Sequence, residues 1–196
     1  MSQWGEGVRQ RRTGAVLLDD IATAVMAELG EHGYGGVTFE GVARRAKTSK
    51  TVLYRRFSTR ADMVISSALR SANPAVREIP LDQGLAPGLH AAARVLAERL
   101  SIVGLANVNA LIGEADEQAR AMFATVSVHP GLRFIQQLYE AEVVAGRLDK
   151  KVLEEVYIRF PLVYVIGEIL TRGTVDEAAI GRMIDAVIVP FLENLR

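Results

Sequence analysis

Two stretches near the N-terminus decide the fold: T-F-E-G-V-A-R-R-A at residues 38–46 and S-K-T-V-L-Y-R-R-F at residues 49–57. Thr38 and Ser49 are favourable N-cap residues, because a side-chain hydroxyl can accept a backbone N–H of the first helical turn. After each cap, apolar residues recur at helical spacing. The sequence therefore predicts two short helices joined by a tight turn, which is the spacing of a helix-turn-helix.

The second of these helices has two chemically different faces. Leu53 and Phe57 lie four residues apart and are expected to face inward, toward the first helix. A separate face, spanning ~140° of the helical wheel at ~100° per residue, carries Lys50, Thr51, Tyr54 and Arg55. Such a face suits the major groove of DNA, because cationic and hydroxyl side chains can donate hydrogen bonds to base edges and phosphates.

Charge is distributed unevenly along the chain. The whole chain has 23 basic and 23 acidic residues, and this neutrality argues against a protein that coats nucleic acid indifferently to its sequence. Residues 44–60, however, contain seven basic side chains and no acidic one. A local cationic patch on a neutral chain indicates a directed interaction with a polyanion.

Working outward from the two stretches, helical patterns continue on both sides. An apolar helical pattern from residue 16 is expected to stop at the glycine cluster of residues 30–36, and Thr59 is expected to cap a helix that ends before Pro74. Residues 74–88 contain three prolines and two glycines, so we interpret them as a linker.

Helical periodicity then returns, and no convincing strand pattern is present. We expect helices at about 89–104, 107–126, 130–146, 150–172 and 175–195. Gly146 and Gly173 are expected as C-caps, and Thr174 with Glu177 as a capping box. The expected fold is therefore all-α, with an N-terminal three-helix helix-turn-helix domain and connecting helix at 1–73, and a helical ligand-binding and dimerisation domain at 74–196.

Several classes of protein are excluded or disfavoured. The 196-residue chain has no cysteine, which excludes disulfides and thiolate sites. Its longest apolar runs, of about eight residues, fall short of the roughly 20 that a membrane span needs, and the N-terminus has no apolar signal segment, so we expect a cytoplasmic protein. His32, His90 and His129 are far apart, and the usual hydrolase and nucleotide-binding motifs are absent. We therefore expect no enzyme activity, no metal and no cofactor.

The two quoted stretches, with Gly33 and Tyr34 before them and Arg60 after them, resemble the N-terminal domain of the tetracycline-repressor (TetR) family of bacterial transcription regulators. The resemblance covers about residues 14–65. Two positions depart from the family pattern: Lys47 stands where a small turn residue, usually glycine, is common, and Val52 stands where threonine is common. The remainder of the chain resembles the family only in its helical layout.

The resemblance implies a homodimer that binds a palindromic DNA operator as a repressor and is released by a small apolar ligand. It implies that Thr38 holds a backbone phosphate, that Lys50 and Thr51 reach base edges, and that Arg60 grips the DNA backbone. The full set of DNA-contacting residues that it implies is Thr38, Ser49, Lys50, Thr51, Tyr54, Arg55 and Arg60.

The C-terminal half supplies candidates for the ligand and for the partner subunit. The last two expected helices carry wide apolar stripes, which indicate either a deep core or a contact with a partner's helix. For dimerisation we expect Val163, Ile180, Ile184, Val187 and Phe191. For the ligand pocket we expect Met122, Phe123, Phe134, Tyr139, Phe160 and Tyr164, with polarity from Asn107, Asn109 and Glu114; core filling is the alternative role of the aromatic side chains.

Two other functions stay open at this point. One is a small-molecule carrier or enzyme in which the helix-turn-helix is only a core motif with no DNA role. The other is a DNA-coating protein that ignores sequence, for which the balanced net charge is unfavourable.

Overall fold

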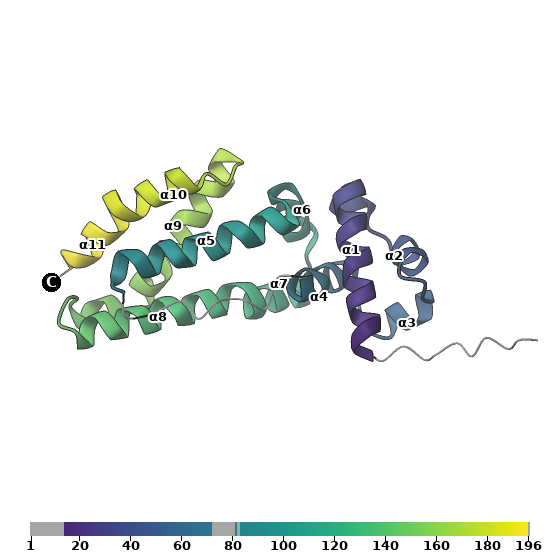
Figure 1. The fold of residues 1–196 in the computed structure, drawn as a ribbon, viewed down its shortest axis with the longest axis horizontal. Helices are drawn as coiled ribbons and strands as arrows, with labels where there is room; N and C mark the ends of the chain where they lie inside the picture. Colours follow the sequence, from purple (N-terminus) through teal and green to yellow (C-terminus); the bar gives the residue numbers. More distant parts are fainter. Residues whose placement is uncertain (1–13, 72–80, 82, 196) are drawn as a thin grey trace, which may run out of the picture.

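The computed structural model describes residues 14–71, residue 81 and residues 83–195. Within these ranges the chain forms helices and no strand, so the expected all-α class is confirmed (Figure 1). Most of the linker expected at 74–88 lies outside the described residues.

The N-terminal helices follow the sequence pattern closely. They are α1 (Gly14–Gly36), α2 (Phe39–Arg45), α3 (Lys50–Tyr54) and α4 (Arg60–Ser71). The first helix leaves helical geometry at Gly33, where φ is 67°, within the glycine cluster that was expected to stop it, and a short helical segment follows this kink up to Gly36. The second of the paired helices is shorter than expected and ends with Arg55 as its C-cap rather than near Phe57.

The other described helices belong to the C-terminal part. They are α5 (Leu85–Val103), α6 (Leu105–Glu114), α7 (Glu117–Phe123), α8 (His129–Val144), α9 (Glu155–Arg172), α10 (Glu177–Met183) and α11 (Val189–Glu193). Wider π-helical turns at Ala124–Val128 and Ile184–Ile188 join α7 to α8 and α10 to α11, and a short 3-10 turn spans Lys150–Leu153.

Three boundaries differ from the sequence expectation for local reasons. The helix expected at 107–126 is broken at Ala115, whose ψ is 128°, and Asp116 opens a new helix by accepting the N–H of Ala119 at 2.7 Å. The last helix is capped by Asp176, which accepts the N–H of Ala179 at 2.9 Å, so the expected Thr174 capping box is wrong. Helix α5 begins at Leu85 rather than 89, and Pro87 fits within its first turn, where the missing N–H is not needed.

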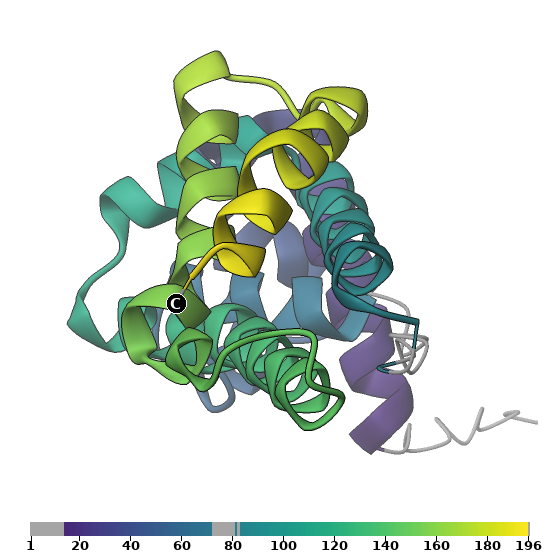
Figure 2. The same ribbon diagram turned by 90° about the vertical axis from the view of Figure 1, so that its left-hand side faces the viewer.

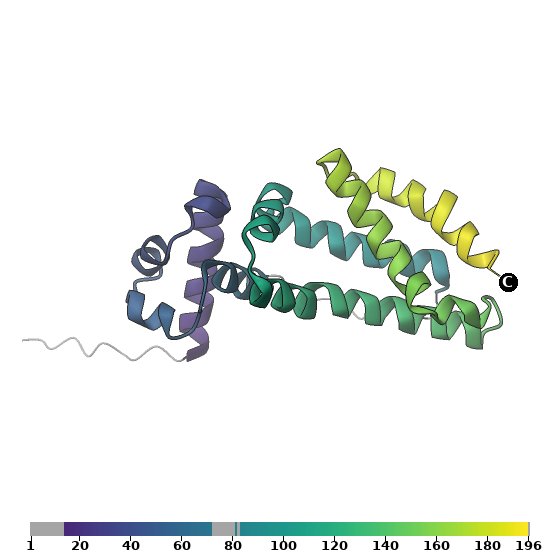
Figure 3. The same cartoon turned by 180° about the vertical axis from the view of Figure 1, so that it is seen from behind.

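Helix α1 separates the paired helices from the rest of the molecule. Helices α2 and α3 lie on its outer side, while α4 and α6 contact it from the other side (Figures 1 and 3). Viewed from the C-terminal end, α5, α8, α9 and the α10–α11 run are grouped around a common interior (Figure 2). The pair α2–α3 is therefore presented at one end of an elongated molecule.

The apolar interior consists of two clusters. The first contains residues of α1 to α4, including Ile21, Val42 and Leu53, and is completed by Leu111, Ala115 and Ala119 from the α6–α7 region. The second contains residues of α5 and α8 to α11. The N-terminal helices therefore share their core with the C-terminal part.

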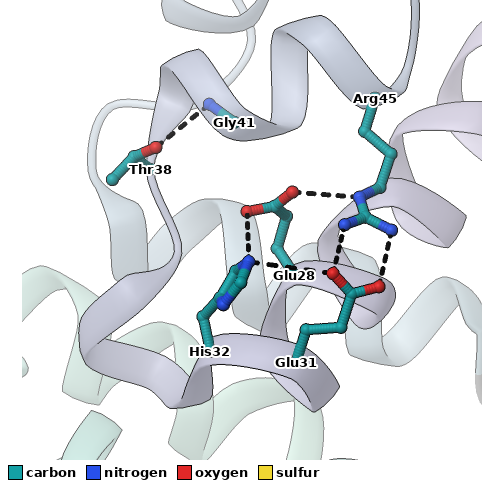
Figure 4. Close-up of polar contacts among 6 residues, drawn as sticks. All are labelled: Glu28, Glu31, His32, Thr38, Gly41 and Arg45. Atoms are coloured by element: carbon teal, nitrogen blue, oxygen red, sulfur yellow. Dashed lines mark hydrogen bonds and ion pairs between the residues drawn. The ribbon is translucent and has the colours of Figure 1, made fainter.

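A buried carboxylate fixes α2 on α1 (Figure 4). Glu28 of α1 is 3% exposed, and its Oε1 accepts the Nε–H of Arg45, at the end of α2, at 2.9 Å. The same guanidinium donates to Glu31 and lowers the pKa of that carboxyl. Gly41 makes this arrangement possible, because a Cβ at that position would lie 2.7 Å from Oε2 of Glu28.

We predict that Glu28→Gln lowers the melting temperature more than Glu31→Gln does. Both changes remove one negative charge beside Arg45, but only Glu28 is buried, and a buried group that loses its charge-assisted hydrogen bond costs more than an exposed one. Thermal unfolding followed by circular dichroism gives the comparison. Equal shifts for the two variants would show that the buried carboxylate does not hold α2 in place.

Candidate nucleic-acid interface

The turn between α2 and α3 has an unusual backbone. Lys47 is the one non-glycine residue of the described ranges with a positive φ, at 51°. The turn is closed by the N–H of Thr48, which donates to the carbonyl of Ala43 at 3.0 Å. The left-handed region is unfavourable for a residue with a Cβ by roughly 1 kcal/mol, so the departure from glycine noted in the sequence carries a backbone cost.

Both expected N-caps are confirmed. Thr38 Oγ1 accepts the N–H of Gly41 at 3.0 Å, and Ser49 Oγ accepts the N–H of Val52 at 3.3 Å. Each hydroxyl keeps its own hydrogen, which can be donated to a phosphate oxygen. The caps therefore fix the starts of both helices and leave one donor at each start.

Tyr54 is exposed but firmly placed. Its ring stacks on Phe39 with centroids 4.3 Å apart and planes 12° apart, and the residue is 60% exposed. The stack links the end of α3 to the start of α2. An aromatic ring held on the surface in this way presents its hydroxyl to a ligand with little loss of side-chain freedom.

The recognition face, defined as Lys50, Thr51, Tyr54 and Arg55, is exposed throughout. Opposite it on the same helix, Leu53 is fully buried, which confirms the two-faced helix that the sequence predicts. Lys50 has an exposed acidic neighbour, with its Nζ 3.4 Å from Oε2 of Glu40. Such an exposed pair is weak, so it can be exchanged for a contact with DNA.

The basic residues of the stretch 44–60 fall into two groups, those that form ion pairs with acidic side chains and those that do not. Arg45 and Arg60 are engaged in ion pairs with Glu28 and Glu31 and with Glu114, respectively. Exposed cations without an ion pair inside the described part of the chain are Arg44, Lys47, Arg55 and Arg56. These side chains and Lys50 supply the positive charge around α3.

Arg60 does not lie where its expected role would place it. Its guanidinium donates to the carbonyl of Gly35 at 3.0 Å, lies 4.6 Å from the ring centroid of Tyr34, and forms an ion pair with Glu114 of α6. These contacts hold it in the junction between the N-terminal helices and α6. A contact between Arg60 and a DNA backbone, which stays a prediction, would require these contacts to be exchanged for a phosphate.

Asn107 completes the same junction. Its Oδ1 accepts the N–H of Tyr34 at 2.8 Å, and its Nδ2 donates to the carbonyl of Val103 at 2.8 Å. Asn107 and Glu114 were expected to give polarity to a ligand pocket. In the structure Asn107 instead joins α6 to the end of α1, and Glu114 joins α6 to Arg60 at the start of α4. No local sequence signal identifies this role, because the partners are distant along the chain.

A large apolar cavity lies in the C-terminal part. It has a volume of about 830 Å³ and is bounded by residues of α4 to α9 and of the Ile184–Ile188 turn. Among the expected lining residues, Phe123 and Phe134 border it. The most numerous contributors, which the sequence analysis missed, come from α5: Leu89, Ala92, Ala93, Val95, Leu96, Arg99, Leu100, Ile102 and Val103.

The other expected lining residues lie elsewhere. Tyr139 is buried in the second cluster, where burial raises the pKa of its hydroxyl, and its oxygen is 3.5 Å from the carbonyl of Tyr157. Met122 packs against the first cluster. Phe160 and Tyr164 stack on one another with centroids 5.7 Å apart, on a different side of α9.

That side of the molecule carries an exposed apolar face, defined as Val163, Tyr164, Val187 and Phe191. Each of these side chains is at least one-third exposed, and Phe191 also contacts Phe160 at a centroid distance of 5.0 Å. Ile180 and Ile184 do not belong to it. They are buried in the second cluster at 4% and 1% exposure because α10 and the following turn pack on α5, so the expectation that they contact a partner is corrected.

The described residues offer neither a metal site nor a single membrane-spanning helix. They contain no group of three or more His, Asp or Glu side chains arranged to hold a metal ion. None of their helices alone has the length and apolar character of a membrane span; α5 and α6 meet those criteria only as a pair, with an 80° bend between them.

The chain was also compared with known proteins. Residues 21–66, which contain α2, α3 and most of α1, match the family described as bacterial regulatory proteins, tetR family. The chain therefore carries a TetR-family N-terminal domain. Its paired helices form a DNA-binding helix-turn-helix of the TetR type, as the resemblance implied. No curated protein sequence matches the chain.

The fold of nearly the whole chain is similar to that of several solved structures of TetR-type proteins. A protein from Mesorhizobium loti assigned to the TetR family of transcriptional regulators has 18% identity and a TM-score of 0.67, covering 93% of this chain and 98% of its own. A TetR transcriptional regulator from Agrobacterium tumefaciens has 23% identity and a TM-score of 0.65, covering 89% and 93%. The fatty acid degradation regulator FadR from Bacillus halodurans has 16% identity and a TM-score of 0.63, covering 95% and 99%.

We predict that Lys47→Gly makes the domain more stable than Lys47→Ala does, by about 1 kcal/mol. Both variants lose the same charge, but only glycine adopts the positive φ of this turn without a Cβ penalty. Chemical denaturation of both variants measures the difference. An alanine variant as stable as the glycine variant would contradict the strain that we assign to this turn.

Proposed function

We propose that this chain is a sequence-specific transcriptional regulator that binds DNA as a homodimer. We further propose that it is a repressor, released from a palindromic operator by a small apolar ligand. The observation that carries the proposal is the recognition face on α3. It is cationic, exposed and rigidly supported by the Phe39–Tyr54 stack at one end of the molecule.

The recognition face has the chemistry to read base edges. Lys50 and Arg55 offer donors for guanine O6 and N7, and Thr51 offers a hydroxyl and a methyl group. Tyr54 and the cap hydroxyls of Thr38 and Ser49 are suited to phosphates, which set the register of the helix on the duplex. Arg60 is left out of the first set of contacts, because it would have to give up Glu114 and Gly35.

The exposed apolar face on α9 and the C-terminal helix supports a homodimer. Val163, Tyr164, Val187 and Phe191 present apolar surface that water would otherwise cover. A two-fold axis through such a face pairs each patch with its own copy. Two recognition helices related by the same axis read two half-sites of an inverted repeat, about one turn of DNA apart.

The cavity supports release by a ligand, because it touches a helix of the DNA-binding domain. Val64, Ile65, Ala68 and Leu69 of α4 border the cavity, and Val64 and Ile65 also belong to the first apolar cluster. A ligand that binds one α4 arrangement more tightly shifts the population toward it. A cytoplasmic location, beside the chromosome, goes with this function.

The carrier or enzyme alternative predicts ligand binding without DNA affinity. A non-specific DNA-coating protein predicts equal affinity for all duplexes. The DNA measurement that follows separates both from a sequence-specific regulator.

We predict that Lys50→Ala and Tyr54→Ala each weaken operator binding by about tenfold. Lys50→Ala removes a contact with a base edge, which is worth about 1–3 kcal/mol, and Tyr54→Ala removes a hydrogen bond to a charged phosphate, which is worth about 1.5–3 kcal/mol. The operator is first isolated by selecting genomic fragments that the purified protein retains. Fluorescence anisotropy then gives the dissociation constants at a stated salt concentration.

Lys150→Ala is the matched control, because it removes an exposed lysine from the 3-10 turn after α8. Its affinity should equal that of the parent chain. If both recognition-face variants bind the operator as tightly as the parent chain does, α3 is not part of the DNA interface and the proposal is wrong.

We predict that Phe191→Asp converts the dimer to a monomer, because a charge would be buried in an apolar interface. The control is Val144→Asp, which places the same charge on an apolar residue that is 89% exposed at the end of α8. Sedimentation analysis should give twice the 21.3 kDa chain mass for the parent and the control. A Phe191 variant that still sediments as a dimer would place the interface elsewhere.

A further inference from the structure

The described residues that line the cavity in the C-terminal part are almost all apolar. Its volume of about 830 Å³ falls in the range of pockets that enclose one small-molecule ligand. Among the described residues that line it, only Arg99 and Gln137 have polar side chains, and none is acidic. The ligand must therefore be largely hydrocarbon, with its polarity concentrated at one place.

Arg99 is a cation that the cavity does not neutralise. It lies on α5, is partly buried, and makes no hydrogen bond or ion pair within the described ranges of the chain. Removing a guanidinium from water without a partner is unfavourable, and its planar fork of donors matches a carboxylate in particular. An anionic group on the ligand would satisfy it.

The position of Arg99 along α5 sets the direction and length of the ligand. Arg99 is in the last part of α5, near α6, while Leu89, which also borders the cavity, is near the beginning of α5. The two residues are ten positions apart in the sequence, which corresponds to about 15 Å along the helix at a rise of about 1.5 Å per residue. An extended chain of roughly 12 carbons covers that length, because each bond of about 1.5 Å advances ~1.25 Å in a zigzag.

We infer that the ligand of this cavity is an aliphatic chain with a terminal carboxylate, of roughly 12 carbons, with the carboxylate on Arg99 and the tail toward Leu89. The inference rests on the proposed function, because it names the class of ligand that would act through α4. The carboxylate end would lie near Ile102 and Val103, at the end of α5 that leads into α6. The tail would lie among Leu89, Ile184 and Ile188.

Isothermal titration calorimetry of the full chain with dodecanoate tests this assignment, with 1-dodecanol as the uncharged probe of equal length. Arg99→Gln should weaken dodecanoate binding at least tenfold and leave dodecanol binding unchanged, since a hydrogen bond to a charged group is the interaction removed. Shortening the acid should weaken binding about fourfold for each methylene removed.

Arg94→Gln is the matched control. Arg94 is an exposed cation on the same helix and does not border the cavity, so its variant should bind dodecanoate like the parent chain. Thermal unfolding of each variant shows that the fold is retained. Equal affinity for dodecanoate and dodecanol, equal loss in both arginine variants, or no dodecanoate binding by the folded parent would each overturn the inference.

The affinity of the same protein preparation for its selected DNA operator is measured without ligand. This measurement distinguishes a failure of the ligand assignment from a failure of the proposed regulator function. A chain that binds the operator but not dodecanoate keeps the regulator function and loses this ligand class. A chain that binds dodecanoate through Arg99 but binds no duplex keeps the ligand class and loses the regulator function.

Discussion

Helix α4 packs against the apolar cluster of the N-terminal helices on one side and borders the cavity on the other. The connection between the two parts of the molecule depends on this double contact. Val64 and Ile65 belong to the apolar cluster that supports the helix-turn-helix and also border the C-terminal cavity. Cores are close-packed, so a change in what fills the cavity is felt by the residues that border it. The DNA-binding end and the cavity are therefore joined through shared side chains and not through a flexible tether.

A polar junction beside α4 strengthens this connection. Arg60 at the start of α4 joins Gly35 and Glu114, and Asn107 of α6 holds the N–H of Tyr34. These contacts link the end of α1, the start of α4 and α6 at one place. If α6 moves relative to α4, these contacts either break or move together with α6. The orientation of the helix-turn-helix therefore depends on the helices around the cavity.

Features that depend on neighbouring residues could be predicted from the sequence. The caps at Thr38 and Ser49 and the two faces of α3 follow from local hydrogen bonding and helical spacing, and the structure has them. Features that depend on distant partners could not. Arg60, Asn107 and Glu114 look like surface or pocket residues until α6 is placed against α1, and the apolar pattern of Ile180 and Ile184 does not distinguish a core from an interface. A pocket was expected, but its α5 wall was missed for the same reason, because the aliphatic residues of α5 look like ordinary core.

In the proposed function, α3 reads DNA sequence as one of a symmetric pair of helices. The most direct measurement is to let the purified chain select from a pool of random duplexes at near-physiological salt and to sequence what it retains. A symmetric pair of recognition helices predicts enrichment of one inverted repeat whose half-sites lie about 10 base pairs apart, centre to centre, or a multiple of that spacing. Retained duplexes with no enriched sequence, or with a motif that lacks two-fold symmetry, would contradict it.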